Sequence, residues 1–241
     1  MKIDAIGFDA DDTLWHNEDH FAATEDAFAD LVAQWASREQ ASAALLNTET
    51  HNLELFGYGV KSFTLSMIET AMELSAGAIG AADLGVLLDR GKAMLARPAE
   101  LLPGVADVLE ALSPTHRLIL ITKGDLHHQE RKTAMSGVSE HFDAVEVVSE
   151  KDVLSYARVL YRHDIAATSF VMIGNSVKSD VLPAIELGGV GVHIPYEFTW
   201  AHEQVDGQGL NGHGRNHDGA RYWELESIRD VPSLIERLAQ S

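Results

Sequence analysis

The sequence predicts an α/β fold, in which a parallel sheet is flanked by helices and a helical domain is inserted into the chain. Three short apolar runs predict the sheet: residues 3–8 (IDAIGF), 118–121 (LILI) and 170–173 (FVMI). Each run is a few residues long and is followed by small or polar residues, which is typical of buried parallel strands. Helical patterns separate the runs, and strands that alternate with helices favour a doubly wound sheet.

Further strands and a closing helix complete the expected core. Strands are expected over residues 144–148 and 190–194, and a last strand over 221–225 leads into a helix over 231–238. The segment 207–219 (GQGLNGHGRNHDG) precedes that last strand and is rich in Gly, Asn and His. Such a composition is typical of a mobile surface loop.

The long stretch between the first two runs, residues 16–98, carries no strand signal. Its apolar residues recur at helical spacing, for example Phe28, Leu31, Val32 and Trp35. A crossover between parallel strands needs only about a dozen residues, so this stretch is an insertion. We therefore expect a helical cap domain over 16–98 and an α/β core built from 1–15 and 99–241.

Composition and charge exclude several classes of protein. The chain has 241 residues and no cysteine, which excludes disulfides, thiolate metal sites and cysteine nucleophiles. The formal net charge of −19 makes nucleic acid and anionic membranes poor partners. No apolar run is long enough to span a bilayer, and the first residues are too acidic for a signal peptide. A cytoplasmic protein is the expectation.

The acids that could carry chemistry directly follow the first apolar run. Asp9, Asp11 and Asp12 stand there, and ligands of open α/β sheets bind beyond the carboxyl ends of the strands. A solvated acidic loop is the simpler interpretation of such a pattern taken alone. A calcium loop is a second alternative, but Leu14 and His20 occupy positions that require glycine and glutamate.

Other strand ends favour a phosphoryl-transfer site over a solvated loop. The second run ends in Thr122 and is followed by Gly124, where backbone N–H groups could hold a phosphate. Lys151 follows the strand over 144–148, and the run over 170–173 is followed by Asn175 and Asp180. Carboxylates, a hydroxyl, a lysine and an amide at successive strand ends suit metal-assisted phosphoryl transfer.

In these motifs the chain resembles the haloacid dehalogenase (HAD) superfamily over almost its whole length. Residues 9–13 (DADDT) match the first family motif, and Thr122 ends the strand of the second. The lysine of the third motif maps best to Lys151, with Lys132 as the alternative. Residues 174–180 (GNSVKSD) match the fourth, and the helical insertion stands where one type of cap domain is placed.

The resemblance implies a phosphatase with a HAD-like Rossmannoid core. It implies that Asp9 is a nucleophile that becomes phosphorylated and that Asp11 is the general acid and base. Thr122 and Lys151 would complete the catalytic set. The phosphate-binding residues would be Ala10, Asp11, Thr122, Lys123, Gly124 and Lys151. The implied cofactor is Mg²⁺, held by Asp9, Asp11, Asn175 and Asp180.

Two positions depart from the family pattern. Asp12 replaces a common glycine, which suggests a somewhat different turn. Asn175 replaces the usual first aspartate of the fourth motif. An amide oxygen can still bind a hard cation, but the lost charge should weaken binding, with Asp180 taking over part of the role. The sequence leaves open whether Asn175 or Asp180 is the direct ligand.

Alternatives within and outside the family stay open. A 2-haloacid dehalogenase needs no proton donor two residues after the nucleophile, so Asp11 stands against it. A phosphonatase would need a lysine in the cap, where Lys61 and Lys92 are the only candidates. A phosphomutase keeps the same motifs, and a non-catalytic binding protein would share the fold. We expect a small phosphate ester as substrate and a monomer or homodimer.

Residues near the predicted site have simpler interpretations too. Residues 57–61 (GYGVK) form either a loop that faces the site or a plain connection between helices. Trp15 is expected to serve packing more than binding, and His16 could line the pocket. The remaining histidines of interest lack the spacing of metal ligands and are expected at solvated loop positions: His127, His128, His213 and His217.

Overall fold

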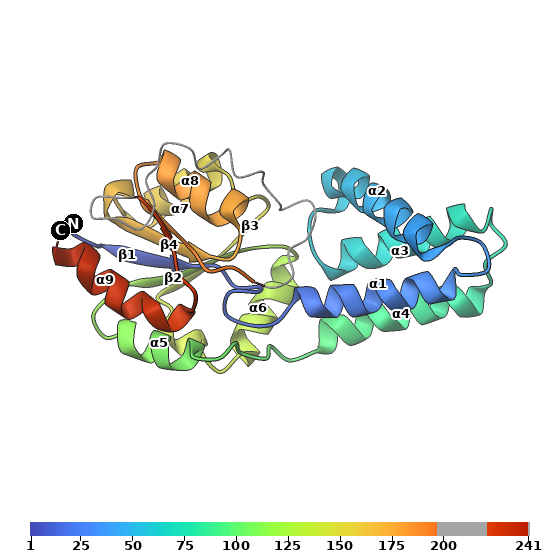
Figure 1. Ribbon diagram of the computed structural model, residues 1–241, viewed down its shortest axis with the longest axis horizontal. Coiled ribbons are helices and arrows are strands. Elements are labelled where there is room, and N and C mark those ends of the chain that lie inside the picture. Colours follow the sequence, from blue (N-terminus) through green and yellow to red (C-terminus); the bar gives the residue numbers. More distant parts are fainter. Residues whose placement is uncertain (197–220, 241) are drawn as a thin grey trace. The chain divides into compact units, whose positions relative to one another are not determined.

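The computed structural model describes residues 1–196 and 221–240. Within these residues the strands form one six-stranded sheet in the order β3-β2-β1-β4-β5-β6, and all neighbours pair in parallel. The strands are β1 (Ala5–Phe8), β2 (Leu118–Lys123), β3 (Ala144–Val148), β4 (Phe170–Gly174), β5 (Val190–His193) and β6 (Tyr222–Glu224). The predicted α/β class is confirmed (Figure 1). The segment 207–219, with His213 and His217, lies outside the described residues.

Strand β1 lies inside the sheet, between β2 and β4, because its short apolar sequence is buried on both faces. Gly7 makes this packing possible. A Cβ atom there would lie 2.5 Å from the Phe170 ring and 2.8 Å from the Met172 sulfur. The carboxyl end of β1, where Asp9 follows, therefore has a strand end on each side.

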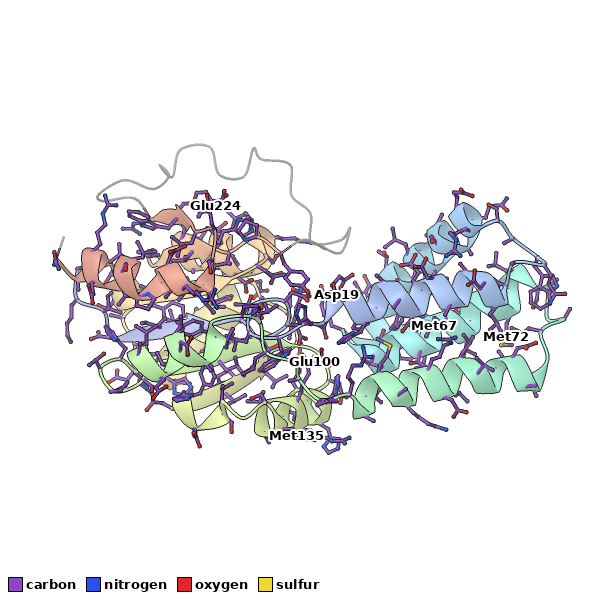
Figure 2. The ribbon with its side chains drawn as sticks, turned by 60° about the horizontal axis from the view of Figure 1, so that its bottom comes forward. Asp19, Met67, Met72, Glu100, Met135 and Glu224 are labelled. Carbon is purple, nitrogen blue, oxygen red and sulfur yellow. The ribbon has the colours of Figure 1, made fainter. Side chains whose placement is uncertain are left out.

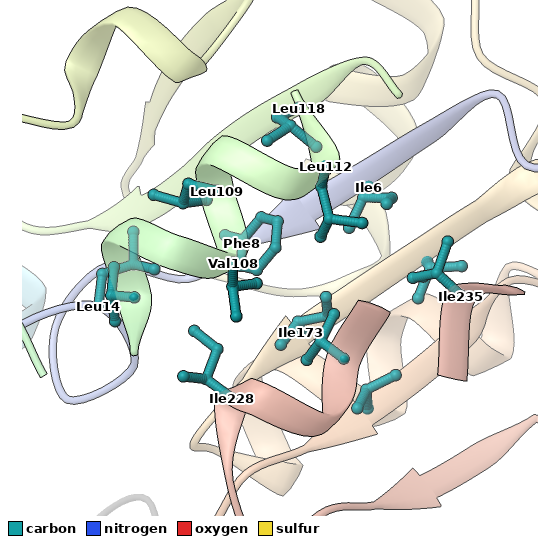
Figure 3. Packing of buried hydrophobic residues seen from close by; sticks show 14 of the residues in the cluster. Ile6, Phe8, Leu14, Val108, Leu109, Leu112, Leu118, Ile173, Ile228 and Ile235 are labelled. Atoms are coloured by element: carbon teal, nitrogen blue, oxygen red, sulfur yellow. The ribbon is translucent and has the colours of Figure 1, made fainter. Parts of the chain in front are cut away.

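Two helical layers cover the sheet and bury two separate clusters of apolar side chains. One face packs against α5 (Val105–Leu112) and α9 (Val231–Gln240). Figure 3 shows this cluster, in which Phe8 of β1 lies among Val108, Leu109 and Ile173. The other face packs against α7 (Val153–Arg162) and α8 (Leu182–Glu186). Packing on both faces holds the strand ends in fixed register, which a site assembled from several strands requires.

The chain divides into two compact units. One comprises Met1–Glu18, Ala99–Lys123 and Gln129–Ser241, and the other comprises Asp19–Pro98 and Gly124–His128. These boundaries differ from those expected from the sequence at two places. Residues 16–18 stay with the α/β unit, and 124–128 at the start of α6 (Leu126–Met135) join the helical unit.

The helical unit contains α1 (Glu18–Leu31), α2 (Arg38–Phe56), α3 (Val60–Leu74) and α4 (Ala81–Ala96). Its core gathers apolar side chains from all four helices, such as Phe28 and Leu87. On α3, Met67 is fully buried, whereas Met72 lies on the exposed face (Figure 2). None of the described helices is both long and apolar enough to cross a membrane.

The segment 57–61 connects two helices. Helix α2 ends at Phe56 and α3 begins at Val60, and two glycines in left-handed backbone conformations make the turn between them. Lys61 lies in the first turn of α3, and its ammonium group contacts the Asp125 carboxylate at 2.9 Å. Short helical turns among the residues that the structure describes are Ser139–His141, Ala167–Ser169, Val177–Val181 and Ile228–Asp230.

Candidate active site

Lys151 joins two carboxylates that follow different strands. Its ammonium group donates to Asp9 Oδ1 and, at 2.7 Å, to Asp180 Oδ1. The Lys151 side chain is only 2% exposed, and Asp180 is fully buried. The structure therefore brings together the ends of β1, β3 and β4 through these three residues, all of which the sequence singled out.

Burial and charge set the protonation of this trio. Burial raises the pKa of Asp9 to about 7, with Lys151 acting against the rise and the Asp180 charge adding to it. Burial alone would lower the pKa of Lys151, but the carboxylates of Asp180 and Asp9 overcome it and raise that pKa. Lys151 therefore stays an ammonium ion, a fixed positive charge beside the Asp9 carboxyl group.

Asp180 is anchored on both of its oxygens. Oδ1 accepts from Lys151 and, at 3.5 Å, from the Tyr156 hydroxyl, and Oδ2 accepts from the Ser176 N–H group at 3.0 Å. Gly174 leaves the space for this carboxylate, because a Cβ atom there would lie 2.2 Å from Asp180 Oδ2. The protein itself therefore supplies hydrogen-bond partners for both oxygens of Asp180.

Asp11 is held by three donors. Its Oδ1 accepts from Trp15 Nε1 at 2.7 Å and Lys132 Nζ at 2.5 Å, and its Oδ2 accepts from Gln129 Nε2 at 2.8 Å. Burial works to raise the pKa of Asp11, but Lys132 and the hydrogen bonds hold that pKa below its usual value. The sequence offered Lys132 only as a substitute for Lys151, and it did not point to Gln129.

Asp12 shapes the turn that follows Asp9 and has a structural role. Its φ of 61° is left-handed, a conformation that glycine adopts freely and aspartate tolerates. Asp12 can therefore adopt the backbone conformation that glycine would have at this position, and the different turn that the sequence suggested is not required. The carboxylate accepts the N–H groups of Asn17 at 2.9 Å and Glu18 at 3.0 Å, at the start of α1. Trp15 is fully buried, as expected for packing, and also donates to Asp11.

Thr13, which the sequence did not place in the site, links Asp9 to Asn175. Its hydroxyl lies 3.3 Å from Asp9 Oδ2 and 3.4 Å from Asn175 Oδ1, and it accepts the Asn175 N–H group at 3.0 Å. A carboxylate and an amide oxygen thus lie near one hydroxyl. The sequence feature that could have placed Thr13 in the site is its position in the first motif, four residues after Asp9.

This oxygen pair is the part of the site that fits Mg²⁺. Magnesium takes oxygen ligands, commonly one or two from carboxylates with water supplying several others. Asp9 Oδ2 and Asn175 Oδ1 are oxygen atoms of this kind that could bind the ion, whereas both oxygens of Asp180 already have protein donors. No group of three His, Cys, Asp or Glu side chains that could hold a metal occurs within residues 1–196 and 221–240.

The other predicted phosphate-binding residues lie at the ends of β1 and β2. Thr122 is 1% exposed, and its hydroxyl is 3.5 Å from the carbonyl oxygen of Lys123. Lys123 Nζ donates to the Ser179 hydroxyl at 3.1 Å, which ties the end of β2 to the turn after β4. Ala10 is fully buried, and Gly124 has a φ of 129° and falls in the helical unit.

The structure places three of the histidines that the sequence singled out. His16 Nδ1 lies 2.6 Å from the Tyr196 hydroxyl oxygen. The expectation of a loop is wrong for His127 and His128, because both lie in the first turn of α6. His127 is exposed to solvent as expected, whereas His128 is buried. A helix begins there because the Asp125 carboxylate accepts the His128 N–H group at 2.9 Å.

A parallel sheet in which a carboxylate follows an inner strand and contacts a buried lysine is the arrangement found here. It agrees with the family of hydrolases that the chain matches. The chain belongs to the haloacid dehalogenase-like hydrolases, whose family model matches residues 3–188. It is similar to a haloacid dehalogenase-like family hydrolase from Xanthomonas campestris, with 40% identity and a TM-score of 0.85. The similarity covers 99% of this chain and 93% of that one.

More distant relatives differ in their chemistry. The pyrimidine 5′-nucleotidase YjjG of Escherichia coli strain K12 is 20% identical over 245 residues, which cover 98% of this chain and 99% of that protein. The L-2-haloacid dehalogenase from Xanthobacter autotrophicus shares the fold, with 17% identity, a TM-score of 0.61 and coverage of 97% and 98%. Both phosphate ester and carbon–halogen hydrolysis therefore occur among the chains similar to this one.

Proposed function

We propose that this protein is a magnesium-dependent phosphatase that hydrolyses a small phosphate monoester through phosphorylated Asp9. The observation that carries the proposal is the placement of a second carboxyl group, Asp11, two residues after Asp9 in a buried cluster of donors. Expulsion of a halide needs no proton, whereas expulsion of an alcohol from a phosphate ester does. A positioned acid therefore favours the phosphatase over the dehalogenase.

In the first step Asp9 attacks phosphorus. A bond forms between a carboxylate oxygen of Asp9 and phosphorus while the bond from phosphorus to the ester oxygen breaks. Asp11 gives its proton to the departing oxygen, so that an alcohol leaves. Asp11 is an ion-paired carboxylate in the free protein, and the negative charge of the arriving phosphoryl group favours its protonation.

In the second step a water molecule attacks the phosphorus of the aspartyl-phosphate. Asp11 now accepts a proton from that water, and the Asp9 carboxylate leaves. Lys151 stays charged throughout and compensates the negative charge at the phosphoryl oxygens, and Thr122 offers a hydroxyl at the end of β2. The burial of these groups strengthens their electrostatic effect.

Asp9 and Asn175 would hold the magnesium ion, whereas both oxygens of Asp11 already accept from protein donors. When bound, Mg²⁺ lowers the repulsion between the Asp9 carboxylate and the anionic substrate. We assign Asp180 to the anchoring of Lys151 instead of direct metal binding, because its oxygens already accept from Lys151 and Ser176. The monomeric or homodimeric state and the cytoplasmic location stay predictions of the sequence.

The test is phosphate release from 4-nitrophenyl phosphate, with and without Mg²⁺, by the native chain and by Asp9→Asn. Asp107→Asn is the matched control, since it removes an exposed carboxylate of α5 in the same unit. We expect release that needs both Mg²⁺ and Asp9 and that Asp107→Asn leaves unchanged. Chloride release from 2-chloropropionate, with no phosphate release, would instead establish the dehalogenase.

Pyrimidine nucleoside 5′-monophosphates are the first natural class of substrate to test. The reason is the similarity of the chain to a pyrimidine 5′-nucleotidase over nearly the full length of both proteins. A phosphomutase would transfer the phosphoryl group between positions of its substrate and release little free phosphate. Measuring free phosphate beside total substrate consumption separates these two activities.

A further inference from the structure

Helix α6 presents two buried polar side chains to Asp11. Gln129 and Lys132 are three residues apart, which places them on one face of the helix. Gln129 is 3% exposed and Lys132 is 8% exposed. Buried polar side chains of this length lose conformational freedom when they are ordered, so their contacts must stabilise them.

Each of the two side chains has a second contact that fixes its position. The Gln129 amide group that donates to Asp11 also donates to the Lys123 carbonyl at 2.9 Å. The Lys132 ammonium group donates to Asn17 Oδ1 at 2.9 Å. The donors that reach Asp11 are therefore themselves held by the ends of neighbouring elements.

We infer that Gln129 and Lys132 are positioning residues for Asp11 in the proposed phosphatase reaction, on which this inference rests. They reach different oxygens of the carboxyl group, Lys132 reaching Oδ1 and Gln129 reaching Oδ2. Two donors from one side restrict rotation of that group. A proton donor must lie within hydrogen-bond reach of the departing oxygen, so this restriction acts on the first chemical step.

The two buried lysines of the site then have separate tasks. Lys151 contacts the nucleophile Asp9 and the anchor Asp180, whereas Lys132 contacts Asp11. Replacing Lys151 should slow the reaction with every phosphate ester, because the phosphoryl charge is common to all of them. Replacing Lys132 should act most on esters whose departing oxygen needs a proton.

The experiment compares phenyl phosphate with 4-nitrophenyl phosphate, which have similar size but different need for protonation. The variants are Lys132→Met and Gln129→Leu, with Asp11→Asn as the reference and Arg131→Met as the control. Arg131 is exposed on the same helix. The measured quantity is kcat/KM, which covers the steps up to departure of the phenol.

We expect Lys132→Met and Gln129→Leu to lower kcat/KM for phenyl phosphate by roughly 10- to 100-fold, the range for a displaced catalytic group. The loss for 4-nitrophenyl phosphate should be several-fold smaller, with the same pattern in Asp11→Asn. The double variant of Lys132→Met and Asp11→Asn should be no slower than Asp11→Asn alone, because a positioning residue acts through the group it positions. Arg131→Met should leave both substrates unchanged.

Equal losses with both substrates, or additive losses in the double variant, would overturn the inference and leave the proposed function standing. Failure of the native chain to release phosphate from either ester would overturn the proposed function and the inference with it. If Lys132→Met does not fold by circular dichroism, Lys132→Gln and Gln129→Leu supply the same comparison. Lys132→Gln removes the positive charge, and Gln129→Leu removes the amide group that donates to Asp11.

Discussion

Replacing Lys151 by methionine should destabilise the protein strongly. The methionine side chain is similar in length to that of lysine, so the substitution removes mainly the positive charge and the N–H donors of Lys151. The two carboxylates that Lys151 joins, Asp9 and Asp180, would then lie buried together without a cation. Asp180 has no access to water that could compensate, because it is fully buried.

The magnitude follows from the distance and the burial. Two unit charges 2.7 Å apart attract by about 6 kcal/mol at an effective dielectric constant of about 20. Desolvation of the charges offsets part of this attraction, and removal of one partner from a buried pair costs about 3–5 kcal/mol. That loss is a large fraction of the about 5–15 kcal/mol by which a domain is stable.

Urea denaturation at pH 7, followed by circular dichroism, measures this loss. Lys2→Met is the control, because the Lys2 side chain is 82% exposed in its ion pair with Asp4. This substitution should change the free energy of unfolding by less than about 0.5 kcal/mol. Adding Asp180→Asn to Lys151→Met should restore part of the stability, because it removes one of the unpaired charges. A Lys151→Met variant as stable as Lys2→Met would refute the reasoning.

Two further predictions concern Asp9 and the space around Asp180. Burial raises the pKa of Asp9 from 3.8 to about 7, so the folded protein binds more protons than the unfolded chain between these values. The free energy of unfolding of the metal-free protein should therefore fall, by on the order of a few kcal/mol, as pH rises from about 4 to about 7. Asp9→Asn should remove this fall in urea titrations at several pH values, and an unchanged slope would contradict the assigned pKa. Gly174→Ala should cost about 1–3 kcal/mol, because its new methyl group meets the anchored Asp180 carboxylate. Gly85→Ala, in open space on α4, should instead stabilise the protein by about 0.5–1 kcal/mol, and equal effects in thermal unfolding would count against the steric argument.

The sheet was predictable because its strands are short, apolar and buried on both faces. All three primary runs became strands, and the strand over 144–148 has the predicted bounds. The ends of strands were less certain: β1 begins at Ala5 instead of Ile3, and β2 extends to Lys123. Apolar pattern marks the middle of a strand, whereas hydrogen bonding decides its ends.

The site was predictable where its residues directly follow strands. Asp9, Lys151 and Asp180 follow three strands that the sequence located, and the carboxyl ends of parallel strands meet at one edge of a sheet. Gln129 escaped prediction, and Lys132 was named only as an alternative to Lys151, because both residues lie inside a helix. A polar residue on a helix looks like a solvent-facing residue until the packing of that helix is known.

The sequence by itself determined the α/β class and the place of the acids after the first strand, and it favoured Lys151 over Lys132 as the lysine of the site. Those features depend on local pattern and chain order. Only the tertiary structure decided that Asp180 anchors Lys151, that Thr13 joins Asp9 to Asn175, and that α6 holds Asp11. These contacts join residues far apart in the chain, and their partners depend on how the helices and strand ends pack in space. Packing also determines burial, and burial together with neighbouring charge sets the pKa of each acid in the site.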